Sequence, residues 1–583
     1  MEKTDVTLHS RVRILMALMF LLGAIFVVRL FYVQVIRHDY YEAEALKEHT
    51  AKFSIAASRG EIYAKDGYDK IAPLVLNEPS YTVFADPRYV KDETKAAEVL
   101  RRIAGGNLVE GFEESLKNKD RQYVVLAKLL NKQQADLLKK EELAGIGLQE
   151  SEKRTYLEGT LAAQVLGFVN GEGKGQYGIE QGYNDQLAGV AGQLKAITDV
   201  NGIPISVGAN TVQTPAQDGE DVVLSIDRNI QSYVEKALKA GLERVHATKG
   251  SAVVINPNNG QIMAMASLPT YNPGEYQKVT DYNAFQNPTI SDPYEPGSVT
   301  KTFTVAMGLN EGVIQPDTTY VNTGSTKVAD ATIKNLGNEL LGNVKMLDAL
   351  RYSYNTGMVH ILRLLGGGDI NDQAKDKFYQ YLTDRFLLNE ITGIPLAFEA
   401  AGQVISPDDE QGGPVRYANM TFGQGMTMTM LQAVSTFSAL VNGGTYYSPQ
   451  IISGVVNEKG DVVAKEPIVK KTGVISADAS EKLRMMTHEI RAGSLGKLDR
   501  PGYTTGGKTG TAQVYDPTTG QYSKTKTIGG YLGYGGQNRP EYVIMIRVDD
   551  SDLGDFAGTQ GAAPIFTDIS NWLLDYLKIQ PRG

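Results

Sequence analysis

The chain has 583 residues, a formal net charge of -9 and no cysteine, with 42% hydrophobic and 21% charged residues. These proportions are those of folded proteins and exclude a wholly disordered chain. The acidic balance argues against a nucleic-acid-binding protein, which needs a basic face. The lack of cysteine excludes disulfides, thiolate metal sites and cysteine nucleophiles. Six scattered histidines without an HExxH motif point to no zinc site, so we expect neither a metal nor a cofactor.

The first element in chain order is an apolar segment at 14–36. It contains 23 residues and one charge, Arg29. A helix of that length spans roughly 34 Å, enough to cross a hydrocarbon core of about 30 Å. Arg11 and Arg13 precede the segment, so we expect residues 1–13 in the cytoplasm and the bulk of the chain outside. A cleaved signal peptide is the alternative. No small-x-small cleavage site follows the run, so we expect an uncleaved single-pass anchor in the cell membrane.

The part of the chain beyond the anchor changes character near residue 219. The segment 37–219 is polar and mixed, and its apolar spacing predicts helices at 92–103 and 124–140. We expect this segment to form an elongated, membrane-proximal domain of mixed α/β structure. Residues 220–583 then form a second domain.

The second domain has strand patterns near both of its ends. Turn residues at 256–260 join two of the predicted strands into a hairpin. The patterns predict strands at 222–226, 251–255, 261–267, 528–534 and 542–548, and helices at 229–241 and 565–577. Hairpins at both ends of a helical middle predict one antiparallel sheet flanked by helices, an α+β fold.

A candidate nucleophile lies at the start of a helix predicted from Pro296 to about residue 309. Ser298 and Lys301 are three residues apart and share one face of that helix. A hydroxyl is a weak nucleophile until a base takes its proton, and a neutral lysine amine can do so. Ser-x-x-Lys also begins at Ser494 and Ser523, so this pattern alone is weak evidence.

A second pattern selects among these serines. Ser353-Tyr354-Asn355 is the one Ser-x-Asn in the chain, and only Ser298 precedes it. The order of the two patterns therefore favours Ser298. We expect Tyr354, between the two polar residues, to pack in the core.

A third pattern, Lys-Thr-Gly, supplies a cation and a hydroxyl. It occurs at Lys508-Thr509-Gly510 and again at Lys471. Lys508 leads through Thr511 toward two predicted strands, whereas Lys471 leads into a helical run with no predicted strand pair behind it. A cation beside the nucleophile needs the strand context, so we expect Lys508 to be the functional one.

The three patterns in this order resemble the signature of penicillin-binding proteins and serine β-lactamases. The flanking sequences YEPGSVTK and GGKTGTAQ resemble those of the penicillin-binding proteins. Class A β-lactamases have Asp at the position of Tyr354 and need a deacylating Glu with an Asn four residues later. No glutamate after Asn355 has that spacing, so a fast β-lactamase is not expected.

The segment before residue 220 resembles the class B, monofunctional branch of this family. The sequence from Arg59 to Gly67 is similar to the family's RGxIxDRxG segment, and further similarities lie at Arg154-Thr155-Tyr156 and around Glu180. We expect Arg59 and Arg154 to hold the membrane-proximal domain together. No glycosyltransferase domain fits between residues 37 and 220. The EPGS flank favours the division-specific branch over the elongation-specific one.

The resemblance implies a serine-type peptidoglycan D,D-transpeptidase that acts through an acyl-enzyme. Ser298 would attack the carbonyl of the penultimate D-Ala of a stem peptide while Lys301 takes its proton. Ser353 would pass that proton to the leaving D-Ala amine. Asn355 would hold Lys301 and the substrate amide. A second stem peptide would then take the acyl group.

The third motif would bind the donor. The resemblance implies that Lys508, Thr509 and Thr511 bind the terminal carboxylate of the substrate, with Gly510 between the two threonines. The oxyanion would lie between the N–H groups of Ser298 and Thr511.

The implied partners are stem peptides and their lipid-linked precursor, β-lactam antibiotics, the membrane and a membrane glycosyltransferase, but no nucleic acid. Three alternatives stay open: an elongation-specific transpeptidase, a D,D-carboxypeptidase that uses water as acceptor, and a β-lactam-binding sensor. Such sensors usually need a cytoplasmic signalling domain, and only about 13 residues precede the anchor here.

Overall fold

The computed structural model describes residues 3–582, apart from residues 56, 69, 122, 199–203, 207–212, 338–339 and 517–520. The chain divides into two compact units. One consists of Met1–Ser58 and Gly189–Gly219, and the other of Arg59–Ala188 and Glu220–Gly583. Each unit is described by itself.

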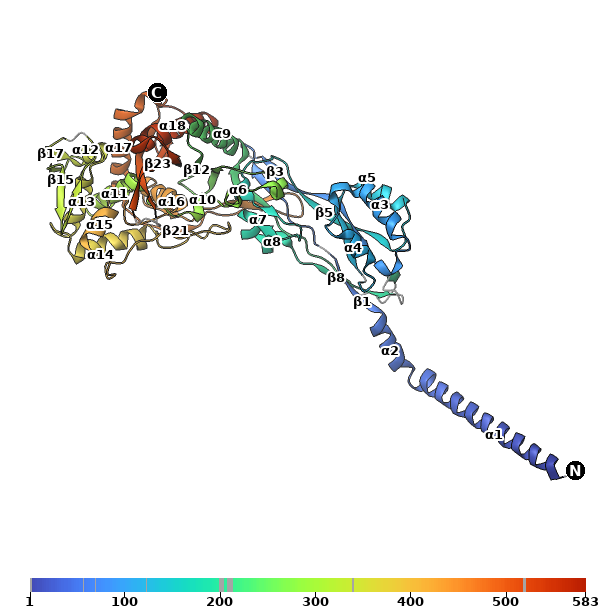
Figure 1. Ribbon diagram of the computed structural model, residues 1–583. Coiled ribbons are helices and arrows are strands. Elements are labelled where there is room, and N and C mark those ends of the chain that lie inside the picture. The colour runs from blue at the N-terminus through green and yellow to red at the C-terminus, as the bar shows by residue number, and fades with distance from the viewer. Residues whose placement is uncertain are drawn as a thin grey trace. The chain divides into compact units, whose positions relative to one another are not determined.

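The first unit begins with a long apolar helix, drawn in blue in Figure 1. Helix α1 (Lys3–Phe31) continues as the π-helical turn η1 (Tyr32–Ile36), and α2 (His38–His49) follows. Residues Ser10–Ile36 form the one helical stretch of the described residues that is long and apolar enough to cross a membrane. This stretch agrees with the predicted anchor at 14–36 and is a single-pass membrane anchor.

The first unit also contains a four-stranded sheet. Strand β1 (Thr50–Ile55) pairs antiparallel with β8 (Gly192–Thr198), which also pairs with β9 (Pro204–Ser206) and β10 (Gln213–Thr214). About 130 residues of the second unit, Arg59–Ala188, lie between β1 and β8 in the chain. The two strands nevertheless pair in one sheet.

The second unit contains a seven-stranded sheet that combines distant parts of the chain. Its order is β20-β19-β11-β2-β3-β4, with β5 also paired to β3. The strands are β2 (Ile62–Lys65), β3 (Ile71–Ala85), β4 (Val124–Leu130), β5 (Ile146–Tyr156), β11 (Asp221–Asp227), β19 (Ile452–Val456) and β20 (Val462–Ala464). The predicted domain limit at residue 219 runs through this sheet and stays a prediction.

The structure of residues 124–140 differs from the prediction made from the sequence. It was expected to be one helix, but it forms β4 followed by α5 (Lys132–Lys140). Strand β4 pairs with β3, and Asn131 forms a capping box with Gln134 that starts the helix one residue after the strand ends. The predicted helix at 92–103 is present as α3 (Glu93–Ala104), capped by Asp92.

The predicted antiparallel sheet is present with five strands in the order β13-β12-β24-β23-β22. The strands are β12 (Lys249–Ile255), β13 (Ile262–Leu268), β22 (Thr504–Asp516), β23 (Gln521–Gly536) and β24 (Pro540–Ser551). All four neighbouring pairs are antiparallel. The predicted hairpin and the two late strands therefore join as expected.

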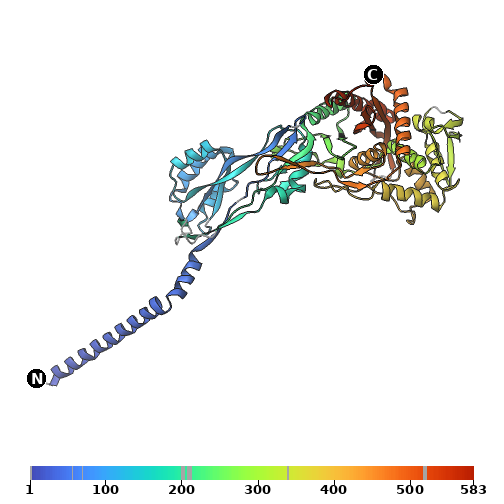
Figure 2. The ribbon, with the colours of Figure 1, turned by 180° about the vertical axis from the view of Figure 1, so that it is seen from behind.

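Helices cover both faces of this sheet, because its strands bury alternate residues on opposite sides. In β24, Ile544 and Ile546 pack in the core formed with α9 (Arg228–Arg244) and α18 (Ala563–Tyr576). Val543 and Met545 pack in the opposite core, which contains α16 (Met430–Val441), a helix with every residue buried. Figures 1 and 2 show α9 and α18 on one side of the sheet and α16 on the other.

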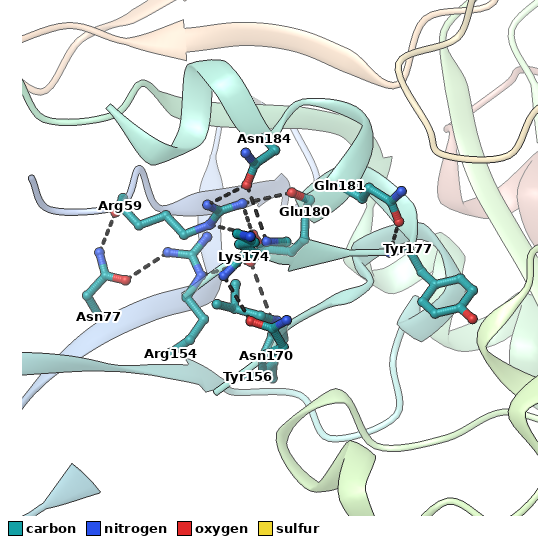
Figure 3. A network of polar contacts seen from close by, with 12 residues as sticks. Arg59, Asn77, Arg154, Tyr156, Asn170, Lys174, Tyr177, Glu180, Gln181 and Asn184 are labelled. Atoms are coloured by element: carbon teal, nitrogen blue, oxygen red, sulfur yellow. Dashed lines mark hydrogen bonds and ion pairs between the residues drawn. The ribbon is translucent and has the colours of Figure 1, made fainter. Parts of the chain in front are cut away.

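A buried ionic network joins strands β3 and β5 of the second unit to helix α7 (Gly178–Gly182) and to Arg59 (Figure 3). Glu180 is fully buried and accepts hydrogen bonds from Arg59 Nε at 2.6 Å and from Arg154 Nε at 2.8 Å. Arg154 Nη1 donates to Asn77 Oδ1 at 2.8 Å, and Arg59 Nη1 donates to Asn184 Oδ1 at 3.0 Å. Both arginines thus contact structural partners, in agreement with the interpretation of their sequence patterns.

Candidate active site

Ser298 lies in a tight turn that leads into a buried helix. The turn η6 (Gly297–Thr300) is a 3-10 helix, and α11 (Lys301–Asn310) continues it, as the sequence predicts. Gly297 has φ 61°, and a Cβ atom there would lie 2.7 Å from the carbonyl oxygen of Thr511. Only glycine therefore lets the turn approach β22 this closely. Ser298 itself is half-buried.

A glycine of another segment supports this turn. The N–H of Gly297 donates to the carbonyl oxygen of Gly423 at 3.2 Å, and a Cβ at Gly423 would lie 2.2 Å from the carbonyl oxygen of Gly297. The N–H of Gly425 donates to Glu295 Oε1 at 2.7 Å. The two glycines of Gly-Gln-Gly at 423–425 make this contact possible. No pattern in the sequence predicts that they lie beside Ser298.

Lys301 contacts the second motif directly. It is 1% exposed, and its Nζ donates to Ser353 Oγ at 2.9 Å and to the carbonyl oxygen of Ser353 at 2.5 Å. Ser353 lies between α12 (Met346–Arg351) and α13 (Asn355–Leu365) with φ 58°, in the left-handed region. This conformation costs a non-glycine residue about 1–2 kcal/mol. It places both oxygens of Ser353 at the Lys301 amine.

The surroundings of Lys301 favour its neutral form. Burial holds the pKa of Lys301 well below its ordinary value, and the positive charge of Lys508 lowers that pKa further. A neutral amine has two N–H bonds and one lone pair. Because both N–H bonds are used by Ser353, the lone pair is left to take a proton. The hydroxyl of Ser298, one turn away, makes no hydrogen bond within the described part of the chain.

Lys508 lies on β22, the strand that packs against the Ser298 turn. Its side chain is 4% exposed, and burial lowers the pKa of Lys508 to about 8. Lys508 Nζ donates to Thr509 Oγ1 at 3.2 Å and to the carbonyl oxygen of Thr509 at 3.1 Å. At Gly510, a Cβ atom would lie 2.9 Å from the carbonyl oxygen of Pro296. The absence of that atom lets the motif approach the turn that carries Ser298.

Two side chains of the motifs differ in contact from what the resemblance implies. Asn355, expected to hold Lys301, donates instead from Nδ2 to the carbonyl oxygen of Lys334 at 3.0 Å, and Ser353 holds Lys301. The hydroxyl of Thr511 donates to the carbonyl oxygen of Asp555 at 3.2 Å. Thr511 must give up this bond before its hydroxyl can donate to a substrate carboxylate.

The other matches to the motifs lie in different settings. Ser494 is in α17 (Ala477–Ser494), and its hydroxyl donates to the carbonyl oxygen of Ile490 at 2.9 Å. Ser523 lies on β23. Lys471 ends the short strand β21 (Val469–Lys471), which pairs with an earlier strand, and α17 follows it, so Lys471 leads into a helical run as expected.

The strand pair of Lys471 is nevertheless separate from the five-stranded sheet. Strand β21 pairs only with β18 (Tyr446–Tyr447), in a two-stranded sheet. Lys471 Nζ donates to the carbonyl oxygen of Asp384.

Among the residues that the structure describes, no group of three His, Asp or Glu side chains is arranged to hold a metal ion.

Comparison with known proteins gives two family matches and relatives that span the chain. Residues 250–571 match the penicillin-binding protein transpeptidase domain, and residues 54–224 match the penicillin-binding protein dimerisation domain. The chain is 30% identical over 588 residues to stage V sporulation protein D of Bacillus subtilis, covering 100% of this chain and 88% of that protein. It is 28% identical over 574 residues to peptidoglycan D,D-transpeptidase FtsI of Escherichia coli, covering 97% and 91%.

Solved structures share the fold. A peptidoglycan synthetase from Bifidobacterium adolescentis superposes with a TM-score of 0.71 at 23% identity, over 92% of this chain and 98% of that one. Penicillin binding protein 3 of Mycobacterium tuberculosis, complexed with ampicillin, superposes with a TM-score of 0.68 at 23% identity, over 91% and 98%.

Proposed function

Because the chain belongs to the class B penicillin-binding proteins, which are peptidoglycan D,D-transpeptidases, we propose that it cross-links stem peptides through an acyl-enzyme on Ser298. The observation that carries this proposal is the pair of hydrogen bonds from Lys301 to Ser353, in a buried site beside Lys508. A neutral lysine in contact with a serine can both accept and relay a proton.

The first half of the reaction forms the acyl-enzyme. Ser298 Oγ attacks the carbonyl carbon of the penultimate D-Ala while its proton goes to the lone pair of Lys301. The oxyanion is stabilised by the N–H groups of Ser298 and Thr511, whose backbones approach closely at Gly297. When the intermediate collapses, a proton passes from Lys301 through Ser353 Oγ to the nitrogen of the terminal D-Ala, which leaves.

The second half reverses these transfers with a new amine. The amine of an acceptor stem peptide attacks the ester carbonyl of the acyl-enzyme and loses a proton through Ser353 to Lys301. Ser298 regains its proton as the ester bond breaks and the new amide forms. Lys508, with Thr509 beside it, provides the positive charge for the terminal carboxylate of the donor.

The cellular setting is part of the proposal. Arg11 and Arg13 precede the anchor and favour a cytoplasmic N-terminus, which leaves the catalytic unit outside the membrane. The family matches assign a transpeptidase and a dimerisation domain, so the glycan strands would come from a separate membrane glycosyltransferase. The EPGS flank of Ser298 supports a septal role, which a fluorescent fusion that gathers at midcell would test against the sidewall pattern of an elongation enzyme.

Acylation by a labelled penicillin tests the chemistry. The β-lactam carbonyl replaces the D-Ala carbonyl, so mass spectrometry should find the adduct on Ser298 and on no other serine. Incubation with a donor peptide ending in D-Ala-D-Ala and an amine acceptor should then give an amide product. An adduct elsewhere would refute the nucleophile. Release of hydrolysed donor without amide product would show a carboxypeptidase, and acylation without turnover would show a sensor.

A further inference from the structure

The turn that presents Ser353 is bonded to a set of buried side-chain amides. Asn322, at the end of β14 (Thr319–Asn322), is 1% exposed and uses both ends of its amide. Its Nδ2 donates to the carbonyl oxygen of Leu340 at 2.8 Å. Its Oδ1 accepts from Asn335 Nδ2 at 3.0 Å, from Thr356 Oγ1 at 3.0 Å and from the N–H of Gly324 at 3.1 Å.

Asn335 caps the start of α13 in place of the residue that precedes this helix. The first N–H groups of a helix have no partner within the helix, and a short polar side chain at the preceding position normally accepts from one of them. That position is Tyr354, whose side chain makes no such bond. Asn335 Oδ1 accepts instead from the N–H of Thr356 at 3.0 Å, although it is 21 residues away in the chain.

The same segment holds the two other residues of the second motif. The hydroxyl of Tyr354 accepts from the N–H of Leu340 at 2.7 Å, and Asn355 Nδ2 donates to the carbonyl oxygen of Lys334 at 3.0 Å. The hydroxyl of Tyr320, also on β14, is hydrogen-bonded to Thr356 Oγ1 at 3.0 Å. Every residue from Tyr354 to Thr356 is thus hydrogen-bonded to Asn322, Asn335, Lys334 or Leu340.

These bonds act on the one residue of the turn that touches the base. Ser353 immediately precedes Tyr354 and is in the left-handed conformation, which persists only where the surroundings hold it. The carbonyl oxygens of Leu350 and Ala349 in α12 accept from the N–H groups of Ser353 and Tyr354 and hold this turn from one end. The contact of Ser353 with Lys301 depends also on how firmly the start of α13 is anchored at the other end. Neither Asn322 nor Asn335 belongs to the three sequence motifs, and neither contacts Lys301.

We propose that Asn322 and Asn335 are positioning residues of the transpeptidase: by anchoring the start of α13 they hold Ser353 against Lys301, and so set the rate of acylation of Ser298. The inference rests on the proposed function. It predicts that loss of the anchor slows the chemical step while the initial binding of donor or penicillin is unchanged.

Substitutions at Asn335 separate anchoring from general stability. Asn335→Ala removes the acceptor for the Thr356 N–H and should lower the first-order acylation rate constant by a labelled penicillin about 10- to 100-fold. The dissociation constant of the non-covalent complex should stay within about twofold of its unsubstituted value. Asn335→Asp keeps an oxygen for the Thr356 N–H but loses the Nδ2 donor to Asn322 Oδ1, so it should restore only part of the lost rate.

Asn442 provides a control for the loss of a hydrogen-bonded side-chain amide, at a position distant in the chain from the three motifs. It follows α16, donates from Nδ2 to the carbonyl oxygens of Pro257 and Thr445 at 2.7 Å each, and accepts from the N–H groups of Gly444 and Thr445. Asn442→Ala therefore breaks four hydrogen bonds of a side-chain amide, against two for Asn335→Ala, in a turn that carries no motif. Its melting temperature should fall, and its acylation rate constant should not.

Acylation rates, penicillin binding and melting temperatures of these variants test the inference. A slow Asn335→Ala with intact penicillin binding, partial rescue by Asp and a normal rate for Asn442→Ala support the inference. A normal rate for Asn335→Ala, or equal rate losses in both alanine variants at equal loss of melting temperature, would overturn it. Ser298→Ala is measured in parallel, because labelling that survives this change would refute the nucleophile assignment instead.

Discussion

Lys301 Nζ and Ser353 Oγ lie 2.9 Å apart although 52 residues separate them in the chain. The proposed base and the proposed relay of its proton are therefore in contact before any substrate arrives. Because both N–H bonds of the neutral amine are occupied by Ser353, the orientation of the remaining lone pair is fixed as well. This arrangement favours fast proton transfer between Lys301 and Ser353, since these two side chains already lie within hydrogen-bond distance.

The pH dependence of acylation should have an alkaline limb set by Lys508. Burial lowers the pKa of Lys508 to about 8, so this side chain is charged below that pH and neutral above it. The carboxylate of donor or penicillin loses its partner as pH rises through about 8, and the second-order acylation rate constant should fall there. Lys508→Arg should move this limb to higher pH, because a guanidinium stays charged. An unchanged limb would show that another group is responsible.

Lys508, and not Lys471, should be needed for acylation. Lys508→Ala removes the buried cation of the site, a loss of about 2–4 kcal/mol by analogy with other electrostatic groups. Lys471→Ala removes a lysine on a separate strand pair and should change the activation free energy by less than about 0.5 kcal/mol. Stopped-flow acylation of both variants measures the difference, and equal losses would contradict the assignment.

Two serines that begin a Ser-x-x-Lys pattern, Ser298 and Ser494, can be compared in the same way. Ser298→Ala should abolish labelling by penicillin, because it removes the proposed nucleophile and the other hydroxyls of the turn and of α11, on Thr300, Thr302 and Thr304, are buried. Ser494→Ala should label at the unsubstituted rate, since its hydroxyl is bonded to a carbonyl within α17. Gel fluorescence after brief exposure to the label distinguishes them. Retained labelling in the first variant, or lost labelling in the second, would be incompatible with this site.

The network around Glu180 should matter for folding. Glu180→Gln leaves two buried guanidinium groups without their shared carboxylate and should lower the free energy of unfolding by about 3–5 kcal/mol. Asp575→Asn breaks an ion pair with Arg500 that is roughly half exposed, and it should cost less than about 1 kcal/mol. Denaturant unfolding compares them. Similar losses in the two variants would mean that Glu180 contributes no more than a surface pair.

Residues 14–36 should be sufficient to explain membrane attachment. A chain that begins at Tyr40 lacks the apolar helix but keeps β1, which pairs with β8. It should appear in the soluble fraction after cell lysis, whereas the full chain should stay in the membrane pellet after carbonate extraction. If the shortened chain also stays in the pellet, a second membrane-binding surface must exist.

Local patterns in the sequence predicted a large part of this protein. The anchor, the hairpin of β12 and β13, the late strands β23 and β24, and helix α18 follow from apolar periodicity and turn residues within short windows. Three short motifs and their order also predicted the family. Where the local signal was ambiguous the prediction was wrong, as at 124–130, whose apolar run suits a helix but pairs with β3.

Only the tertiary structure decided how the motifs meet. The sequence placed Ser298 and Lys301 on one helix, but packing put Ser353 at the amine of Lys301 and lowered the pKa of both lysines by burial. Packing also turned Asn355 to Lys334 and gave α13 a cap from Asn335. Burial, charge proximity and hydrogen bonds between distant segments depend on the assembled core, because no short window of sequence contains both partners.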